Sequence, residues 1–296
     1  FSGPDGGTLE NFTLTGATKS IVIQDTQSTL RGVILTHQKV ATVTEDNSGT
    51  SIHIENSVVQ GLYGGVAISV MDQATLTMNR SLIRDIEQSE QEVDGEVVVS
   101  GGVGIHVARQ ADATLTDVRI QNTHTGMVIG SAVDPTWRAT MDVNRLVMDN
   151  VHVGALVGAY VTLEATDVVF KDMGMASVDA MSATVTGNRW FSRVQPGAYT
   201  SFYATTSSFS LTDVDAGGGM LGMGFAGASS ATLNRVSVGN VIGSGIDFIG
   251  PDLSATLSDV LIKNTQLFPL VLKQAEVEDE RLRVQDSRTL GISAYA

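Results

Sequence analysis

The sequence lacks cysteine and has few prolines, few aromatic residues and few basic residues. With no cysteine among 296 residues, the chain has no disulfide framework, no thiolate metal site and no cysteine nucleophile. Its 18 lysines and arginines face 32 acidic residues, which gives a net charge of -14. This balance argues against nucleic acid or an anionic membrane as the main partner, because either would require a basic surface. No apolar run approaches the roughly 20 residues of a membrane span.

The apolar residues are mostly small or β-branched. Aromatic residues make up 5% of the chain, although 42% of it is hydrophobic. A chain this apolar is not disordered, and its valine, isoleucine and threonine suit short strands. The sequence begins at Phe1 and shows no signal sequence. We therefore expect residues 1–296 to form one domain within a longer chain.

An internal repeat organises the sequence. The segment 112–122, Asp-Ala-Thr-Leu-Thr-Asp-Val-Arg-Ile-Gln-Asn, recurs at 230–240 and 254–264 with the same alternation of apolar residues. Looser copies follow along the chain, mostly 22 to 24 residues apart, and two longer intervals predict insertions at about 87–100 and 131–138. Short alternating segments that end at Gly, Asn or Asp indicate strands joined at tight corners.

A second motif follows each corner and reads Gly-Ile-x-Val or a close variant, as at 104–107 and 245–248. With the Ala-Thr-Leu-x-x-Val-x-Ile-x-Asn motif, it makes nearly the whole chain resemble the right-handed parallel β-helices of the pectin-lyase-like superfamily. The resemblance implies an all-β solenoid of about twelve turns, each of 22–25 residues, whose apolar faces are buried by stacking. Such motifs specify architecture and leave the activity open. Trp190 falls at an interior position of this repeat.

Arginine and aspartate alternate at the first corner of successive turns. Equivalent positions stack about 4.8 Å apart, so alternation places opposite charges next to each other and fixes the register. We interpret this column as structural, with Arg283 expected to continue it, and it comprises Arg80, Asp117, Arg145, Asp167, Arg189, Asp213, Arg235 and Asp259.

Asparagine recurs at the second corner, where stacked side-chain amides can bond from turn to turn. We interpret this column as structural too, and its asparagines are Asn122, Asn150, Asn240 and Asn264.

Two residues beyond the second corner, successive turns carry Glu87, His124 and His152. A stacked carboxylate and two imidazoles could bind a metal ion such as zinc or exchange protons. The alternative is that all three are solvated turn residues.

The two insertions are candidate ligand-binding loops, because loops on rigid scaffolds often carry function. The first is acidic and could bind Ca²⁺ through oxygen ligands, although it lacks the spacing of a calcium loop. No cofactor is required by the sequence. In the second loop a tryptophan beside an arginine could stack on a sugar or tuck onto the rod. The residues concerned are Glu90, Glu92, Asp94, Glu96, Asp134, Trp137 and Arg138.

The outward positions of the Gly-Ile-x-Val strands are small and carry little charge, which predicts a flat contact face. The positions assigned to this face are Ala67, Ser69, His106, Ala108, Val128, Gly130, Val157 and Ala159.

Polysaccharide lyases and galacturonase-type hydrolases are known within the superfamily that the chain resembles. The motifs that such a resemblance would carry over, namely Asn-Thr-Asp, Asp-Asp, Gly-His-Gly and Arg-Ile-Lys strands or a calcium site facing a basic residue, are not found here. The sequence therefore favours a non-catalytic secreted or cell-surface structural or adhesive rod. Its partners would be proteins or like subunits, bound at the coil ends or the flat face. The alternative is a carbohydrate-active enzyme or a polysaccharide-binding module.

Overall fold

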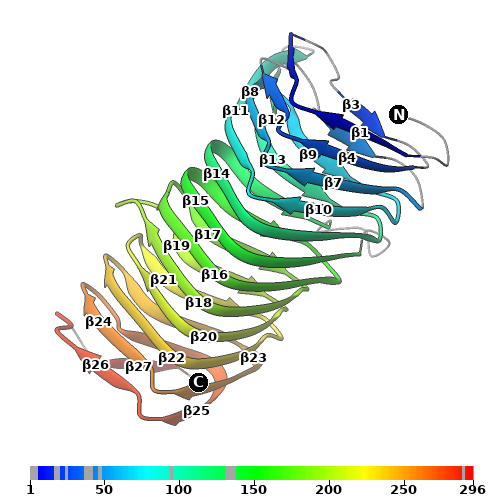
Figure 1. The fold of residues 1–296 in the computed structure, drawn as a ribbon. Coiled ribbons are helices and arrows are strands. Elements are labelled where there is room, and N and C mark those ends of the chain that lie inside the picture. Colours follow the sequence, from blue (N-terminus) through cyan, green and yellow to red (C-terminus); the bar gives the residue numbers. More distant parts are fainter. Residues whose placement is uncertain are drawn as a thin grey trace.

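The computed structural model describes residues 6–16, 21–23, 26–36, 43–45, 49–93, 96–130, 138–288 and 291–295. All of the regular secondary structure in these ranges is β-strand. Figure 1 shows the strands stacked in turns along one axis, with the first and last turns at opposite ends. Nearly all strands pair in parallel with the strand one turn away, because each turn returns the chain to the same face.

Three parallel ladders, A, B and C, form the faces of the coil. Ladder A joins twelve strand segments, of which ten have a neighbouring turn on both sides. Its segments belong to β1 (Gly7–Glu10), β4 (Gln27–Arg31), β7 (Ser51–Glu55), β10 (Thr75–Asn79), β14 (Ala111–Ile129), β15 (Ala139–Val157), β16 (Val161–Met173), β18 (Thr184–Val194), β20 (Ser208–Gly217), β22 (Ser230–Val241), β23 (Ser244–Ser258) and β25 (Leu270–Glu280).

Ladders B and C use the remaining strands and the continuations of the long ones. Ladder B adds β2 (Thr13–Thr15), β5 (Ile34–Thr36), β8 (Val58–Tyr63), β11 (Leu82–Val93), β24 (Leu261–Thr265) and β26 (Arg283–Gln285). Ladder C adds β3 (Ile21–Ile23), β6 (Val43–Glu45), β9 (Val66–Val70), β13 (Val103–Val107), β17 (Ala176–Met181), β19 (Thr200–Thr205), β21 (Leu221–Ala226) and β27 (Ile292–Tyr295). The remaining strand, β12 (Glu96–Gly101), pairs antiparallel with β11 as a hairpin.

The predicted all-β parallel solenoid is confirmed, with about ten complete turns against the twelve expected. The corners form where residues adopt a left-handed backbone, and the first corner holds non-glycine residues there in turn after turn, from Asn56 to Arg281. Asparagine and aspartate tolerate this conformation, whereas arginine does so rarely. Stacking on both sides must therefore stabilise the arginine corners.

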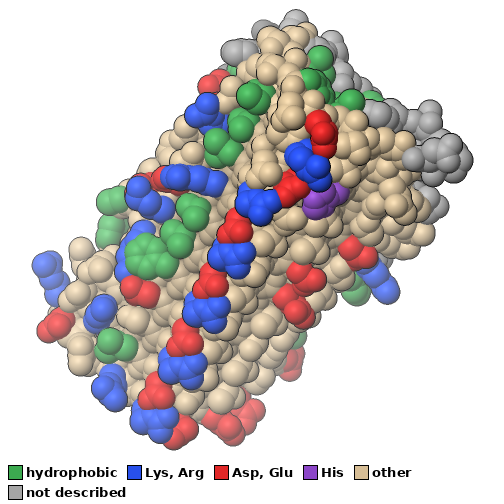
Figure 2. Space-filling view, viewed as in Figure 1, with side chains coloured by type: hydrophobic (Ala, Val, Ile, Leu, Met, Phe, Trp, Pro, Cys, Tyr) green, Lys and Arg blue, Asp and Glu red, His purple; other side chains and the backbone are tan. Residues whose placement is uncertain are grey.

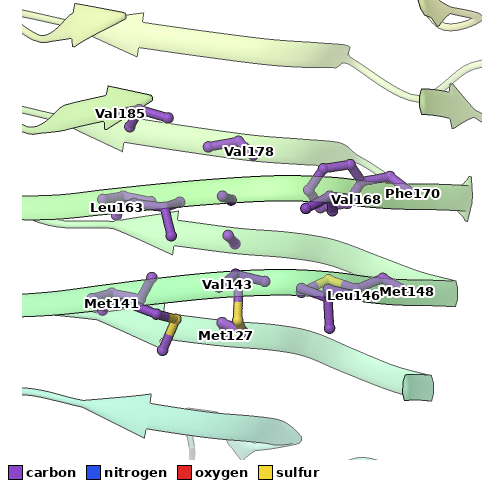
Figure 3. Packing of buried hydrophobic residues seen from close by; sticks show 14 of the residues in the cluster. Met127, Met141, Val143, Leu146, Met148, Leu163, Val168, Phe170, Val178 and Val185 are labelled. Carbon is purple, nitrogen blue, oxygen red and sulfur yellow. The ribbon is translucent and has the colours of Figure 1, made fainter. Parts of the chain in front are cut away.

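The core is a set of apolar columns inside the coil. Figure 3 shows side chains from successive turns gathered there, among them Met141, Leu163 and Val185, which occupy equivalent positions in three turns. Each turn buries its inward side chains against the turns above and below, so no single turn has a core of its own. This explains how a chain with few aromatic residues fills a narrow interior.

Trp190 is the largest buried side chain, at 2% exposure, which confirms the interior position predicted for it. Its indole nitrogen donates a hydrogen bond to the carbonyl oxygen of Ala165 at 2.9 Å. The ring contacts Phe170 and Phe202, with centroid separations of 5.8 and 5.6 Å. Gly187 leaves room for it, because a Cβ atom there would lie 2.7 Å from the indole. A glycine between Ala165 and Leu211 in this column therefore admits the tryptophan.

Candidate functional site

The alternating charges of the first corner form one continuous column. Figure 2 shows arginine and aspartate side chains following one another along the molecule. Arg145 donates two hydrogen bonds to Asp117, from Nε at 2.5 Å and from Nη2 at 2.8 Å. The same bidentate geometry joins Arg189 to Asp167, Arg235 to Asp213 and Arg281 to Asp259.

Arg145, Arg189 and Arg235 each bond to the aspartate of the preceding turn and are attracted to the aspartate of the next turn at longer range. The pKa of Asp167 is lowered chiefly by its hydrogen bonds to Arg189, with further lowering from Arg145. At the start of the column, Arg80 bonds instead to Asn56 and Glu55. The column is thus a chain of strong pairs linked by weaker attractions, and its charges are matched within the fold.

The expected position of Arg283 in this column is wrong. Arg281 adopts the left-handed backbone and bonds to Asp259, while Arg283 lies in β26. The interior column that runs through Leu233 and Leu257 ends at Asp279, which pairs with Leu257. The repeat pattern weakens in this last turn because a charged residue replaces its apolar marker, and the predicted register slips by two residues.

At the second corner, side-chain amides bond from turn to turn. Asn122 donates to Asp85 at 2.8 Å, Asn150 donates to Asn122 at 3.0 Å, and Asn264 donates to Asn240 at 3.2 Å. All five residues have a left-handed backbone. Their side chains satisfy one another where the chain bends.

His124 and His152 stack on adjacent turns, with ring centroids 4.7 Å apart. Burial, and then the neighbouring His152, lower the pKa of His124. The parallel pairing between β11 and β14 ends at Ile86 and Thr123. Gly102, which follows the hairpin, lies beside the side chain of His124. Glu87 forms no ion pair or hydrogen bond with either ring within the described ranges.

The metal site that the sequence suggests at these residues stays a prediction. In the part of the chain that the structure describes, no three His, Asp or Glu side chains lie close enough together to hold a metal ion. The described residues also form no helix that is long and apolar enough to cross a membrane.

Most of the insertion residues lie where their side chains are not described. Glu90 and Glu92 belong to β11 and Glu96 to β12, so the first insertion is a β-hairpin. Asp94, Asp134 and Trp137 lie outside the described residues. Arg138 is described, and its guanidinium lies 5.8 Å from the ring centroid of Tyr160.

The outward positions of ladder C are partly those expected. Ser69, His106 and Val128 share one outward column, whose next member is Leu156. The outward position assigned to Val157 is wrong, since Val157 pairs with the inward residue Ile129 and is 2% exposed. Ala67, Ala108 and Ala159 are buried too, so they do not belong to the predicted contact face. A shift of one residue turns a side chain to the other side of a sheet.

Further along, this outward column carries a group of residues that sequence reasoning missed. Asp179, Tyr203, Gly224 and Asp247 follow Leu156 in four successive turns. Tyr199 precedes β19, and its ring lies 5.7 Å from that of Tyr203 in an edge-to-face contact. We call Asp179, Tyr199, Tyr203 and Asp247 the carboxylate–tyrosine cluster.

The carboxylates of this cluster are electrostatically unlike those of the first corner. Burial raises the pKa of Asp247 to about 6, and a hydrogen bond from Ser244 offsets part of that rise. Burial also raises the pKa of Asp179. The pKa of Tyr199 is raised by burial, then by Tyr203 and by both carboxylates.

Glycine in the same column makes the cluster possible. A Cβ atom on Gly224 would lie 2.8 Å from the ring of Tyr203, so only glycine lets that ring lean over the next turn. The signal was present in the sequence as Gly-Ile-Asp-Phe at 245–248, where the variable position holds Asp247. The turns that hold Asp179 and Tyr203 have serine where the motif has glycine. The motif therefore did not reveal that these two residues occupy its variable position.

A polar groove runs along the third corner, between ladders C and A. It has a volume of about 660 Å³ and crosses five turns. One wall is formed by equivalent outward residues of β16, β18, β20, β22 and β23, and the corner adds four more residues with hydroxyl groups, of which Ser207 and Ser229 are buried. The hydroxyl-bearing residues of the wall and the exposed part of the corner are Thr162, Thr184, Ser208, Ser230, Ser254, Ser182 and Thr206.

Among its described lining residues, the groove has one aromatic side chain and one charge of each sign. Tyr160 and Arg138 lie at one end and Asp252 at the other. Tyr160 is 57% exposed, so most of its ring remains accessible beside the guanidinium of Arg138. The described lining of the groove is therefore electrically balanced, whereas the chain carries a net charge of -14.

No family model matches the chain, and no curated protein does. Several solved structures are similar to it at low sequence identity. A periplasmic alginate epimerase has 8% identity and a TM-score of 0.45, and the match covers 98% of this chain and 74% of the epimerase. The catalytic domain of a GH87 alpha-1,3-glucanase bound to nigerose has 11% identity and a TM-score of 0.39, over 99% of this chain and 60% of that one.

The enzymatically active domain of bacteriophage CBA120 tailspike protein 2 is similar at 10% identity, with a TM-score of 0.38. The match covers 89% of this chain and 42% of the tailspike chain. This chain thus spans less than two thirds of the glucanase and tailspike structures. The fold class itself rests on the three strand ladders, which form a parallel β-solenoid.

Proposed function

We propose that this β-solenoid is a secreted or cell-surface polysaccharide-binding protein. It holds an uncharged glycan chain in the groove of the third corner, parallel to the long axis. The observation that carries the proposal is the row of hydroxyl groups that line this groove in five consecutive turns. The sequence favoured a purely structural rod and left polysaccharide binding as an alternative, and this proposal adopts that alternative.

The chemistry of the lining suits a neutral sugar chain. Every serine and threonine hydroxyl can both donate and accept a hydrogen bond, as can the hydroxyls of a sugar. Equivalent residues in successive turns repeat at about 4.8 Å, so the five turns offer contacts over roughly 19 Å. Tyr160 supplies a flat apolar ring at one end, on which a sugar ring can pack.

Charge selects against acidic polysaccharides. The protein carries a net charge of -14, while Arg138 and Asp252 balance within the groove. A polyuronate would be repelled by the protein as a whole and, among the described residues of the groove, would find one cation to pair with. A neutral glycan meets no such repulsion.

Binding, and not cleavage, is the activity that the groove supports. Glycoside hydrolysis uses a pair of carboxyl groups about 5–10 Å apart across the scissile bond. Among the described residues that line the groove, Asp252 is the one carboxylate.

Affinity electrophoresis and calorimetry against a panel of neutral glycans, with alginate as the acidic comparison, test the proposal. We expect binding to at least one neutral glycan, and a roughly 3- to 10-fold loss of affinity in Tyr160→Ala through lost stacking. Tyr63→Ala is the matched control, since Tyr63 is equally exposed, at 58%, on a different corner. Equal losses in both variants, or binding to alginate alone, would refute the groove as the site. Release of shorter glycans by the wild-type protein would replace binding with catalysis.

A further inference from the structure

The carboxylate–tyrosine cluster lies on the outward face of ladder C, apart from the groove, and the proposed glycan does not use it. Its two carboxylates flank an aromatic pair, and the ring of Tyr203 leans over Gly224 between them. We propose that this cluster is a binding site for a linear ligand that bears two or more ammonium groups. The ligand would lie over the tyrosine rings with an ammonium group near each carboxylate.

The strand register fixes the length of the ligand. Asp179 pairs with Tyr203, Tyr203 with Gly224, and Gly224 with Asp247, so the two aspartates are three turns apart. At about 4.8 Å for each turn, their Cα atoms are separated by roughly 14 Å. A single metal ion cannot bridge carboxylates at this distance, whereas an extended molecule with amines at both ends can.

The tyrosine rings provide the surface between the two charges. Tyr199 is 46% exposed and packs edge-to-face on Tyr203. A cation within about 6 Å of an aromatic ring is attracted to its electron-rich face. The space above Gly224 lets the ring of Tyr203 lean toward the strand of Asp247. The two rings thus form a platform between the carboxylates.

The local potential is negative and nothing in the described structure neutralises it. Both Asp247 and Asp179 contribute to the raised pKa of Tyr199, after burial and Tyr203. Strand β21, which lies between the strands of Tyr203 and Asp247, carries no titratable residue. Strand β25 contributes Lys273, which forms no described ion pair with Asp247.

Asp247 gains most from a cationic ligand. Its Oδ1 atom is buried and has no hydrogen-bond partner within the described structure. A carboxylate that is partly removed from water without a partner is destabilised, and a nearby cation offsets that cost. The first-corner aspartates show the contrast, because each bidentate arginine already supplies that cation.

Two amine probes and one acetylated control separate the possible sources of the ammonium groups. Isothermal titration calorimetry would compare a glucosamine hexamer, an N-acetylglucosamine hexamer and spermine. We expect the glucosamine hexamer or spermine to bind and the N-acetylated hexamer to bind at least 10-fold more weakly at this site. Binding of spermine alone identifies an aliphatic polyamine, and preference for the hexamer identifies an amino sugar.

Two variants tie the binding to the cluster. Asp247→Asn should weaken binding of the amine by about 10-fold or more. Asp142→Asn, on the outward face of ladder A, is the control for a lost surface charge. Equal effects of Asp247→Asn and Asp142→Asn would mean that only net charge matters and would overturn the proposal. Failure of this site leaves the Tyr160 result unaffected.

A pH series with spermine, whose amines stay charged throughout, gives a second readout. Because the pKa of Asp247 lies at about 6 without ligand, the carboxyl group is largely protonated at pH 5 and ionised at pH 7.5. Affinity should therefore fall by up to about 10-fold from pH 7.5 to pH 5 in the wild-type protein. The same change should be absent in Asp247→Asn. A wild-type affinity that does not depend on pH would contradict the site.

Discussion

The first corner and the outward face of ladder C treat the same side chain in opposite ways. At the first corner, Asp117 and Asp167 each receive two hydrogen bonds from an arginine, and their pKa values fall. On ladder C, Asp179 and Asp247 are partly buried without a cation, and their pKa values rise. The two ladder C aspartates, which have no cationic partner among the described residues, are more buried than the first-corner aspartates, which have one.

This contrast separates charges that hold the fold together from charges that remain available to a ligand. The first-corner pairs complete their interactions within the chain, and their two members are exposed side chains that rigidify a corner. The partial burial of the ladder C carboxylates costs free energy, and without a ligand no cation offsets that cost in the described structure. A strongly perturbed pKa on an accessible face is therefore a better sign of a binding site here than the number of charges.

The largest expected effect comes from reversing a charge in the first-corner column. Asp167→Arg would place three arginines in successive turns, because Arg145 and Arg189 flank this position. We expect the melting temperature to fall by several degrees more than in Asp167→Ala, which only removes one pair. Thermal unfolding at low and high salt checks this, and high salt should narrow the difference between the two variants. Equal melting temperatures would show that the column does not act as a unit.

Removing a charge from ladder C should stabilise the protein at neutral pH, whereas reversing a charge at the first corner should destabilise it. Folding raises the pKa of Asp247 from 3.8 to about 6, so the folded wild-type protein loses stability as the pH rises through this window. Asp247→Asn has no such loss. We expect the variant to be more stable than wild type by about 1–2 kcal/mol at pH 7, after allowance for the exposed part of the group, and to show no such advantage at pH 3.5.

Urea unfolding of both proteins at the two pH values measures this difference. A variant that is less stable than wild type at pH 7 would mean that Asp247 has a partner in solution, and it would remove the contrast between the two regions.

The smallest effect is expected at Asp179. Its pKa is raised by burial, as for Asp247, but the shift is smaller. Asp179→Asn should therefore stabilise the protein at pH 7 in the same direction and by less than Asp247→Asn. Parallel urea unfolding curves provide the measurement. If Asp179→Asn proved the more stabilising of the two, the order of burial at the two carboxylates would be reversed.

The repeat in the sequence was enough to predict the solenoid, because a period of 22 to 24 residues forces equivalent positions to stack. It also placed Trp190 inside and brought Arg145 beside Asp117. Once the period is known, columns of residues can be read directly, and interactions within a column depend on little else.

The site was harder to predict, because it depends on contacts between columns. The outward positions of Asp179 and Tyr203 follow from a register that the sequence marks with serine, where other turns have glycine. The position of Gly102 beside His124 depends on where the hairpin returns to the coil, which no local pattern records. Burial of Asp247 depends on how the strands pack around it, so it required the folded structure.

The alternation at the first corner also constrains how this molecule can change in length. Deletion of one turn, residues 208–229, would bring Arg189 next to Arg235, as the strand pairing of these turns shows. Deletion of two turns, residues 208–253, would bring Arg189 next to Asp259 and keep opposite charges adjacent. The solenoid can therefore grow or shrink without electrostatic conflict only by an even number of turns. The length of any ligand-binding face along the axis can therefore vary only in steps of two turns.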